Sequence, residues 1–329
     1  MSALKALARL YPGVAGVVLI AIASQFLSTN YGAPVLVFAL LLGMAMNFLY
    51  KQEGAKAGVD FCATQVLRAG VALLGAGIAF SDIAKIGFSG VAVLISGMAL
   101  IILSGPWLAQ ALGLNRELGL LSGGAVAICG VSAAMTLSSV MPKNEEQSRF
   151  TLLTVIMVTT IGAIAMVVYP IVVQALGLSD HQAGYFLGGA IHDVSHVAGA
   201  GFALSESIGV EAMTVKMVRV ALLIPIAWCF LFAFRSQTRS AGSVSLRPPT
   251  FLLFFIALAI INSLGLIPEQ ASIQLTELSK LGFMLAIVAL GIKTELSGLI
   301  SHGWKPVVLV LIQSVLLGVT VLLWAIMNM

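Results

Sequence analysis

The chain has 329 residues, of which 60% are hydrophobic and only 9% are charged. A soluble globular domain carries roughly 25% charged residues, so this composition excludes a water-soluble protein. The 17 Lys and Arg residues against 13 Asp and Glu give a net charge of +4, but they are scattered and do not indicate nucleic-acid binding. The three cysteines form no CxxC pair, which argues against a disulfide framework and a zinc site.

Apolar segments follow one another along the whole chain, with centres near residues 20, 42, 72, 99, 129, 162, 194, 226, 258, 286 and 316. A run of about 20 apolar residues crosses the hydrocarbon core of a bilayer as a helix, which satisfies its own backbone polar groups. We therefore predict an all-α polytopic membrane protein with about 9–11 transmembrane segments. No linker is long enough to separate soluble domains, so residues 1–329 are expected to form a single membrane transport domain.

Two of these segments, residues 118–140 and 184–204, are unusually rich in Gly, Ala and Ser. Each either crosses the membrane as a broken helix or returns to its own side as a re-entrant hairpin near the midplane. The hairpin alternative is favoured because it places more basic residues on the side of the N-terminus, which is then cytoplasmic by the positive-inside rule. The loop assignment places Lys216, Arg219 and Lys280 on the opposite side.

Two weak internal similarities suggest inverted repeats. Gly123-Gly124-Ala125-Val126 resembles Gly188-Gly189-Ala190-Ile191, and the stretch from Arg68 to Asp82 resembles that from Lys280 to Glu295. Asn47 and Asn262 occupy matching positions before the second pair. Inverted repeats with interrupted helices at the midplane are a recurrent plan of secondary transporters. Small residues are common in membrane helices, so a chance alignment is the alternative.

The first candidate site is the small-residue run that follows Gly123. A helix that begins there points free N–H groups and a positive dipole end at a ligand, which suits an anion. We expect Gly124, Cys129, Gly130 and Ser132 to take part in substrate binding. The alternative is tight helix packing through small residues.

The second candidate site is Ile191-His192-Asp193-Val194-Ser195-His196, because ionisable groups inside an apolar segment indicate a substrate or proton path. His192 and His196 are four residues apart and would share one face of a helix. Histidine titrates near neutral pH, so His192, Asp193 and His196 are proposed to couple a proton, and Ser195 to bind substrate. A metal-binding histidine pair and a purely structural polar contact are the alternatives.

Basic residues form the third candidate group. Lys216 and Arg219 lie three residues apart at the expected start of a helix, where they either attract an anion or extend to the membrane surface. Arg68 lies inside an apolar run and needs a partner, for which Asp60 and Asp82 are the candidates.

These motifs together resemble a known family. Ser122–Ala134, Ile191–Val197 followed by Ala198-Gly199-Ala200-Gly201, and Lys216–Arg219 with Pro225 are similar to the YeiH-type bacterial inner-membrane family, described as sulfate exporters. The resemblance covers essentially the whole chain. It implies a distant similarity to sodium/proton antiporters and bile-acid symporters, with two inverted repeats, a scaffold and a mobile core. Members with Glu and Gln at the positions of Asp193 and His196 favour His192 as the proton carrier.

We therefore expect a secondary transporter of a small anion, namely sulfate, sulfite or a related sulfur oxyanion, which acts in export. A proton is the favoured coupling ion and sodium a possible one. No cofactor, resident metal or nucleic-acid partner is expected, and no enzymatic constellation occurs; relatives of the elevator type suggest a homodimer. A cation/proton antiporter and a passive anion channel are the alternative functions.

Overall fold

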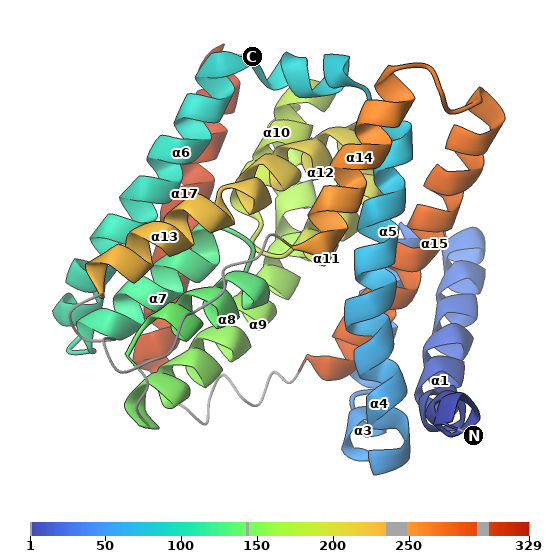
Figure 1. The fold of residues 1–329 in the computed structure, drawn as a ribbon, viewed down its shortest axis with the longest axis horizontal. Coiled ribbons are helices and arrows are strands. Elements are labelled where there is room, and N and C mark those ends of the chain that lie inside the picture. Colours follow the sequence, from blue (N-terminus) through green and yellow to red (C-terminus); the bar gives the residue numbers. More distant parts are fainter. Residues whose placement is uncertain (1, 143–144, 235–248, 295–302, 329) are drawn as a thin grey trace. The chain divides into compact units, whose positions relative to one another are not determined.

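The computed structural model describes residues 2–142, 145–234, 249–294 and 303–328, and every regular element within these ranges is a helix (Figure 1). The elements of the first half are α1 (Ser2–Tyr31), α2 (Val35–Ala45), α3 (Phe48–Lys51), α4 (Glu53–Phe61), η1 (Cys62–Val66), α5 (Leu67–Leu74), η2 (Gly75–Gly77), α6 (Phe80–Ala111), α7 (Arg116–Ala127), α8 (Val131–Val140) and α9 (Glu145–Ala175). Those of the second half are α10 (Asp180–Ala190), α11 (Val194–Leu204), α12 (Glu206–Ala221), α13 (Leu223–Ala233), α14 (Thr250–Ser263), α15 (Glu269–Lys293) and α17 (Trp304–Asn328).

The predicted all-α membrane fold is confirmed. Among the described residues, seven helices are long and apolar enough to cross a membrane. Four shorter apolar helices, α2, α8, α11 and α14, account for the remaining apolar segments of the sequence. Within the described ranges, the seven long and four shorter helices together correspond to the eleven apolar segments of the sequence.

The chain divides into two compact units. Unit 1 comprises residues 1–83, 198–210 and 249–295, and unit 2 comprises residues 84–197, 211–248 and 296–329. Each unit is therefore assembled from separate stretches of the chain, and the single transport domain remains a prediction.

Close helix crossings hold unit 1 together. A Cβ atom on Gly291 of α15 would lie 2.4 Å from the carbonyl oxygen of Leu40 in α2. Likewise, a Cβ atom on Gly75, in η2, would lie 2.3 Å from the carbonyl oxygen of Phe255 in α14. Only glycine permits backbones to approach this closely, so both crossings depend on a missing side chain.

The two predicted matching asparagines make matching contacts. Asn47, just after α2, donates through Nδ2 to the carbonyls of Ile292 at 2.7 Å and Thr294 at 3.4 Å. Asn262, near the end of α14, donates through Nδ2 to the carbonyl of Ile78 at 3.2 Å. Asn47 therefore satisfies carbonyls at the C-terminal end of α15, which α2 crosses, and Asn262 satisfies a carbonyl just after η2, which α14 crosses.

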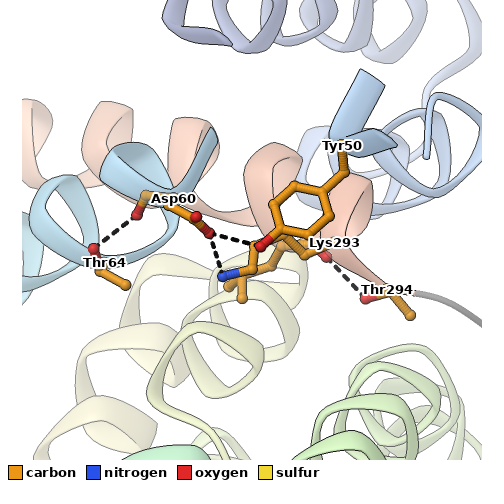
Figure 2. Close-up of polar contacts among 6 residues, drawn as sticks. Tyr50, Asp60, Thr64, Lys293 and Thr294 are labelled. Atoms are coloured by element: carbon orange, nitrogen blue, oxygen red, sulfur yellow. Dashed lines mark hydrogen bonds and ion pairs between the residues drawn. The ribbon is translucent and has the colours of Figure 1, made fainter. Parts of the chain in front are cut away.

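A polar cluster of Tyr50, Asp60 and Lys293 lies next to Thr294, whose carbonyl accepts a hydrogen bond from Asn47 (Figure 2). Asp60 accepts a hydrogen bond from Tyr50 at 3.1 Å and pairs with the Lys293 ammonium at 2.7 Å. The basic partner of Asp60 is therefore Lys293 and not Arg68, the partner that the sequence had suggested. The side chain of Arg68 is exposed. The other suggested partner, Asp82, accepts a hydrogen bond through Oδ2 from the N–H of Ala79.

Along the chain, α9 is preceded by the pair α7 and α8 and followed by the pair α10 and α11, and each pair forms a helical hairpin. The same four residues, Ala-Leu-Gly-Leu, precede the helix start of each hairpin, at residues 111–114 and 175–178. Asn115 then caps α7 by accepting a hydrogen bond from the N–H of Glu117, and Ser179 with Gln182 forms a capping box at the start of α10. Similar local signals therefore start both hairpins.

The first hairpin consists of α7 and α8. Asn115, before α7, donates to Glu146 at the start of α9, so α7 begins at the end of α9 where α8 finishes. A Cβ atom on Gly124 would lie 2.3 Å from Cδ1 of Leu137, which places the two arms side by side. The segment therefore folds back on itself, as the hairpin alternative predicted.

The second segment also reverses. The carboxylate of Glu211 in α12 pairs with His181 at the start of α10. Further along, a Cβ atom on Gly188 would meet Val215, and Arg219 bonds to the carbonyl of Ile191. Because α10 and α12 run in the same direction, α11 between them must return. The hairpins therefore start from opposite ends of α9.

Candidate functional site

The tips of the two hairpins are short breaks between half-helices. The chain leaves α7 through Ile128-Cys129-Gly130 and leaves α10 through Ile191-His192-Asp193. Gly130 has φ 65° and ψ −118°, a conformation open only to glycine. Each tip therefore presents the C-terminal carbonyls of one half-helix and the N-terminal amides of the next.

Lys216 ties the two tips together. Its Nζ atom donates to the carbonyls of Ile128 and Ile191, both at 2.8 Å, and to that of His192. The side chain is fully buried in α12. All three ammonium hydrogens are thus engaged by backbone from both hairpins.

Arg219, one turn later, completes this contact. Nε donates to the carbonyl of Ala127 at 3.0 Å, and Nη1 donates to those of Gly188 and Ile191, also at 3.0 Å. Nη2 donates to the carbonyls of Val126 at 2.9 Å and Ala127 at 2.6 Å. The guanidinium is fully buried, and its five donors are all used.

These contacts correct the placement of both basic residues. They lie inside α12 rather than in a loop, and buried side chains with saturated donors do not extend to the membrane surface. Their positive charge faces the C-terminal ends of α7 and α10, where the helix dipole is negative. Direct hydrogen bonds from either side chain to a substrate would require the loss of a backbone bond.

The N-terminal end of α11 is capped by Asp193. Its Oδ1 accepts hydrogen bonds from the N–H of Ser195 at 3.0 Å and from the Ser195 hydroxyl at 2.5 Å. The other carboxylate oxygen points to the first tip, since a Cβ atom on Gly130 would lie 3.6 Å from Oδ2. Asp193 is partly exposed, whereas Ser195 is buried and serves the cap.

The first tip offers a thiol and a hydroxyl group. Cys129 Sγ lies 2.8 Å from Ser132 Oγ. The thiol is buried, but Ser132 is exposed in the first turn of α8, where amide groups lack intrahelical acceptors. Gly124 lies instead at the contact between α7 and α8, so its position fits packing.

His192 is held by α17. Its Nε2 atom lies 2.8 Å from Oγ of Ser314, whose hydroxyl donates to the carbonyl of Val310 at 2.5 Å. Because that hydroxyl hydrogen is directed to Val310, Nε2 carries the hydrogen in the contact with His192. The imidazole is fully buried.

His196 packs against α9. A Cβ atom on Gly162 would lie 2.7 Å from Nδ1 of His196, so that glycine makes room for the ring. Both ring nitrogens are buried without a hydrogen-bond partner among the described residues. The break before α11 separates His196 from His192, so the expectation that both lie on one helical face is wrong.

Comparison with known proteins identifies the family. The sequence model described as "Conserved hypothetical protein 698" matches residues 12–310. The chain belongs to this family. A UPF0324 membrane protein of Chlorobaculum tepidum is 41% identical, over 95% of this chain and 88% of the relative. The UPF0324 membrane protein TauZ of Paracoccus pantotrophus is also 41% identical, over 94% and 93% of the two chains.

Another UPF0324 membrane protein, from Rhizobium meliloti, is 41% identical over 94% of this chain and 91% of the relative. These matches span nearly the full length of both proteins. Both hairpins and α12 lie within the residues that the family model covers. The family resemblance drawn from the sequence motifs is thereby confirmed, and the chain is a multi-pass member of this membrane-protein family.

In this family member the charges at the tips do not cancel. Lys216 and Arg219 contribute two positive charges, and ionised Asp193 contributes one negative charge, leaving +1. The N-terminal ends of α8 and α11 each carry a partial charge of about +0.5, and the C-terminal ends of α7 and α10 each carry about −0.5. These partial charges cancel to a first approximation. The tips thus form a centre of net positive formal charge, bordered by exposed Ser132.

Two residues of the centre were missed by the sequence analysis. Ser314 holds His192, and its neighbour Gln313 donates to the carbonyl of Gly119 at 3.1 Å in α7. Both are buried in α17. Their signal was present, because two adjacent polar residues interrupt an otherwise apolar run, but their partners lie more than a hundred residues away.

Proposed function

We propose that this protein is a secondary transporter of a small anion and is not an enzyme. The supporting observation is the positive centre at the hairpin tips, where the first turn of α8 presents amide groups and the Ser132 hydroxyl. A helix N-terminus favours negative charge through its dipole and its free N–H groups. Lys216 and Arg219 support binding through their charge and by holding the tips, without touching the anion.

Asp193 supplies the proposed coupling to protons. Its Oδ2 atom faces the first tip, so an ionised carboxylate repels an anion bound near Gly130. Protonation of Asp193 removes this repulsion and raises the net charge at the tips from +1 to +2. Anion and proton binding are thereby linked in the same direction. His192 and His196 are the further candidates for the proton path.

Sulfate, sulfite or a related sulfur oxyanion is the proposed substrate class, and export the proposed direction. The motif resemblance supports this assignment. The matching contacts of Asn47 and Asn262, and the hairpins that start from opposite ends of α9, are consistent with inverted repeats. We further propose a homodimer in the bacterial inner membrane, with a cytoplasmic N-terminus and one unit that moves to give alternating access.

A cation/proton antiporter is the second candidate, because Asp193 is a partly exposed carboxylate at a helix break. Its carboxylate would then bind a cation, with sodium as one possibility, in exchange for protons. The summed charge of Lys216, Arg219 and Asp193 is positive and favours an anion as substrate, whereas the carboxylate of Asp193 taken alone favours a cation. A passive anion channel would use the same groups as the proposed carrier.

The deciding experiment measures sulfate and sulfite flux in proteoliposomes with and without a pH gradient. The carrier predicts saturable flux that follows the gradient, and Asp193→Asn retains anion exchange but loses the dependence on the gradient. Ser132→Ala raises the half-saturation concentration about three- to tenfold, because one hydrogen bond is lost. Ser139→Ala, an exposed hydroxyl on the same helix, is the matched control.

Three outcomes would overturn the proposal. Flux that does not saturate and never runs uphill identifies a channel. Flux of sodium or potassium driven by a pH gradient, with no anion flux, identifies the antiporter. No anion flux under any gradient, from protein shown to be folded, removes the sulfur oxyanion assignment.

A further inference from the structure

Lys280 is placed differently from the loop position that the sequence suggested. It lies at the middle of α15 (Glu269–Lys293), a helix long and apolar enough to cross a membrane. Ionisable residues in the middle of such helices are costly and usually serve a function. Its side chain is 26% exposed and lines a cavity.

Two carboxylates surround this ammonium group. Lys280 Nζ lies 2.9 Å from Oε1 of Glu206 and 2.7 Å from Oε1 of Glu277. The side chains of Glu206 and Glu277 are 64% and 63% exposed, so neither carboxylate is fully occupied by the lysine. One positive and two negative charges leave the group with a charge of −1, which favours a cation.

A cavity adjoins the charged group and belongs wholly to unit 1. Its volume is about 260 Å³. Besides the three charged residues it is lined by Gln25, Val35, Leu36, Phe202, Leu281, Phe283 and Met284. Phe202 and Phe283 stack with their ring centroids 5.9 Å apart. The walls are therefore mainly apolar and aromatic, around one acidic patch.

We propose that this cavity is a second binding site, for an amphiphile with an ammonium head group. The head group would lie between Glu206 and Glu277, and the apolar part would pack on Phe202 and Phe283. Aromatic faces attract cations as well as apolar groups, so both parts of the ligand are matched. The cavity residues belong to unit 1, whereas the tip residues, Lys216 and Arg219 belong to unit 2, and the proposed site does not depend on the transported anion.

The test uses the full chain in lipid nanodiscs of phosphatidylglycerol, with n-hexylammonium as the probe. Thermal unfolding is followed by intrinsic fluorescence, because a ligand that binds only the folded state raises the apparent Tm. The expected result is a saturable rise of a few degrees with n-hexylammonium and none with n-hexanol at the same concentrations. The alcohol has the same chain length but lacks the charge.

Variants assign the effect to the cavity. Glu206→Gln and Glu277→Gln each lower the affinity for n-hexylammonium at least tenfold, whereas Glu269→Gln leaves it unchanged. Glu269 is an exposed carboxylate on the same helix, outside the cavity, and is the matched control. An equal shift from n-hexanol, an equal shift in all variants, or no shift in the parent would each overturn the proposal.

A second arm identifies the source of the ammonium group. Replacing half of the phosphatidylglycerol by phosphatidylethanolamine offers the site an aminophospholipid. If the membrane lipid occupies the cavity, the parent gains stability in these discs and its response to n-hexylammonium falls, while Glu277→Gln shows neither change. If the response is the same in both discs, the site takes a water-soluble amine.

Discussion

Lys216 and Arg219 share one acceptor, the backbone carbonyl of Ile191, whose oxygen lies 2.8 Å from Nζ of the lysine and 3.0 Å from Nη1 of the arginine. On the side of the first hairpin, Lys216 bonds to the carbonyl of Ile128 in the tip and Arg219 to that of Ala127 at the end of α7. The relative position of the two tips therefore depends on two residues of a third helix. Lys216 and Arg219 therefore hold the two tips together and also place two positive charges beside them.

Replacement of the guanidinium by an ammonium tests this connection. In Arg219→Lys, three donors replace five, and the fork that reaches both hairpins is lost. We expect a loss of stability of about 2 kcal/mol or more, because buried carbonyls remain unpaired. Thermal unfolding in detergent measures it. Arg149→Lys, on an exposed position of α9, is the control, and an equal loss in both variants would contradict the assigned role.

The backbone at the first tip requires glycine. Gly130→Ala places a side chain on a residue with φ 65° and ψ −118°, which costs on the order of 1–3 kcal/mol. The tip would also be displaced, so anion flux should fall with stability. Gly54→Ala is the control of opposite sign, because Gly54 is exposed in α4 with open space around it. That variant should gain roughly 0.5–1 kcal/mol, and equal unfolding temperatures for the two variants would rule out backbone strain at Gly130.

The two matching asparagines should have matching energetic roles. Asn47→Ala and Asn262→Ala each leave a helix-end carbonyl without its amide donor, and we expect each to lose about 1–2 kcal/mol of stability. Asn30→Ala is the control, since that exposed side chain bonds only to the preceding turn of its own helix. Chemical denaturation of the three variants provides the comparison. A loss at one of the two sites alone would argue against structural equivalence.

The polar cluster around Asp60 predicts a spectroscopic signal. Burial, followed by the negative charge of Asp60 and the hydrogen bond to it, raises the pKa of Tyr50 to about 12. A raised pKa in the folded state means that the neutral phenol contributes stability below about pH 10, and this contribution is lost as the pH rises through about 12. The parent should therefore lose stability more steeply than Tyr50→Phe in this window.

Ultraviolet titration isolates this tyrosine. The tyrosinate absorbance that the parent has and Tyr50→Phe lacks should appear with a titration midpoint near pH 12. Asp60→Asn should lower this midpoint, because it removes the negative charge beside the phenol (Figure 2). An unchanged midpoint in Asp60→Asn would show that the carboxylate does not control the phenol.

Much of the fold could be predicted from local patterns. Apolar segments of membrane-spanning length identified the helices, and the small-residue content of residues 118–140 and 184–204 indicated that each contains a break. The expectation that a helix begins after Gly123 is wrong, because both Gly-Gly-Ala runs lie inside helices, α7 and α10, and the breaks follow at residues 128–130 and 191–193. The sequence analysis paired Asn47 with Asn262, and in the structure each donates through Nδ2 to a backbone carbonyl near the end of a helical segment. The suggested pairing of Arg68 with Asp60 was wrong, because salt bridges between separate helices depend on rotation and depth, which periodicity does not fix.

By itself, the sequence determined that the chain is a helical membrane protein and which two segments contain helix breaks, since transfer free energy and backbone preference act locally. Only the tertiary structure decided what the polar residues do. It buried Lys216 and Arg219 against carbonyls from segments up to 93 residues away, and it placed Lys280 beside a cavity instead of in a loop. A buried donor bonds to whichever acceptor packing brings within reach, and that acceptor is set by the packing of all the helices together.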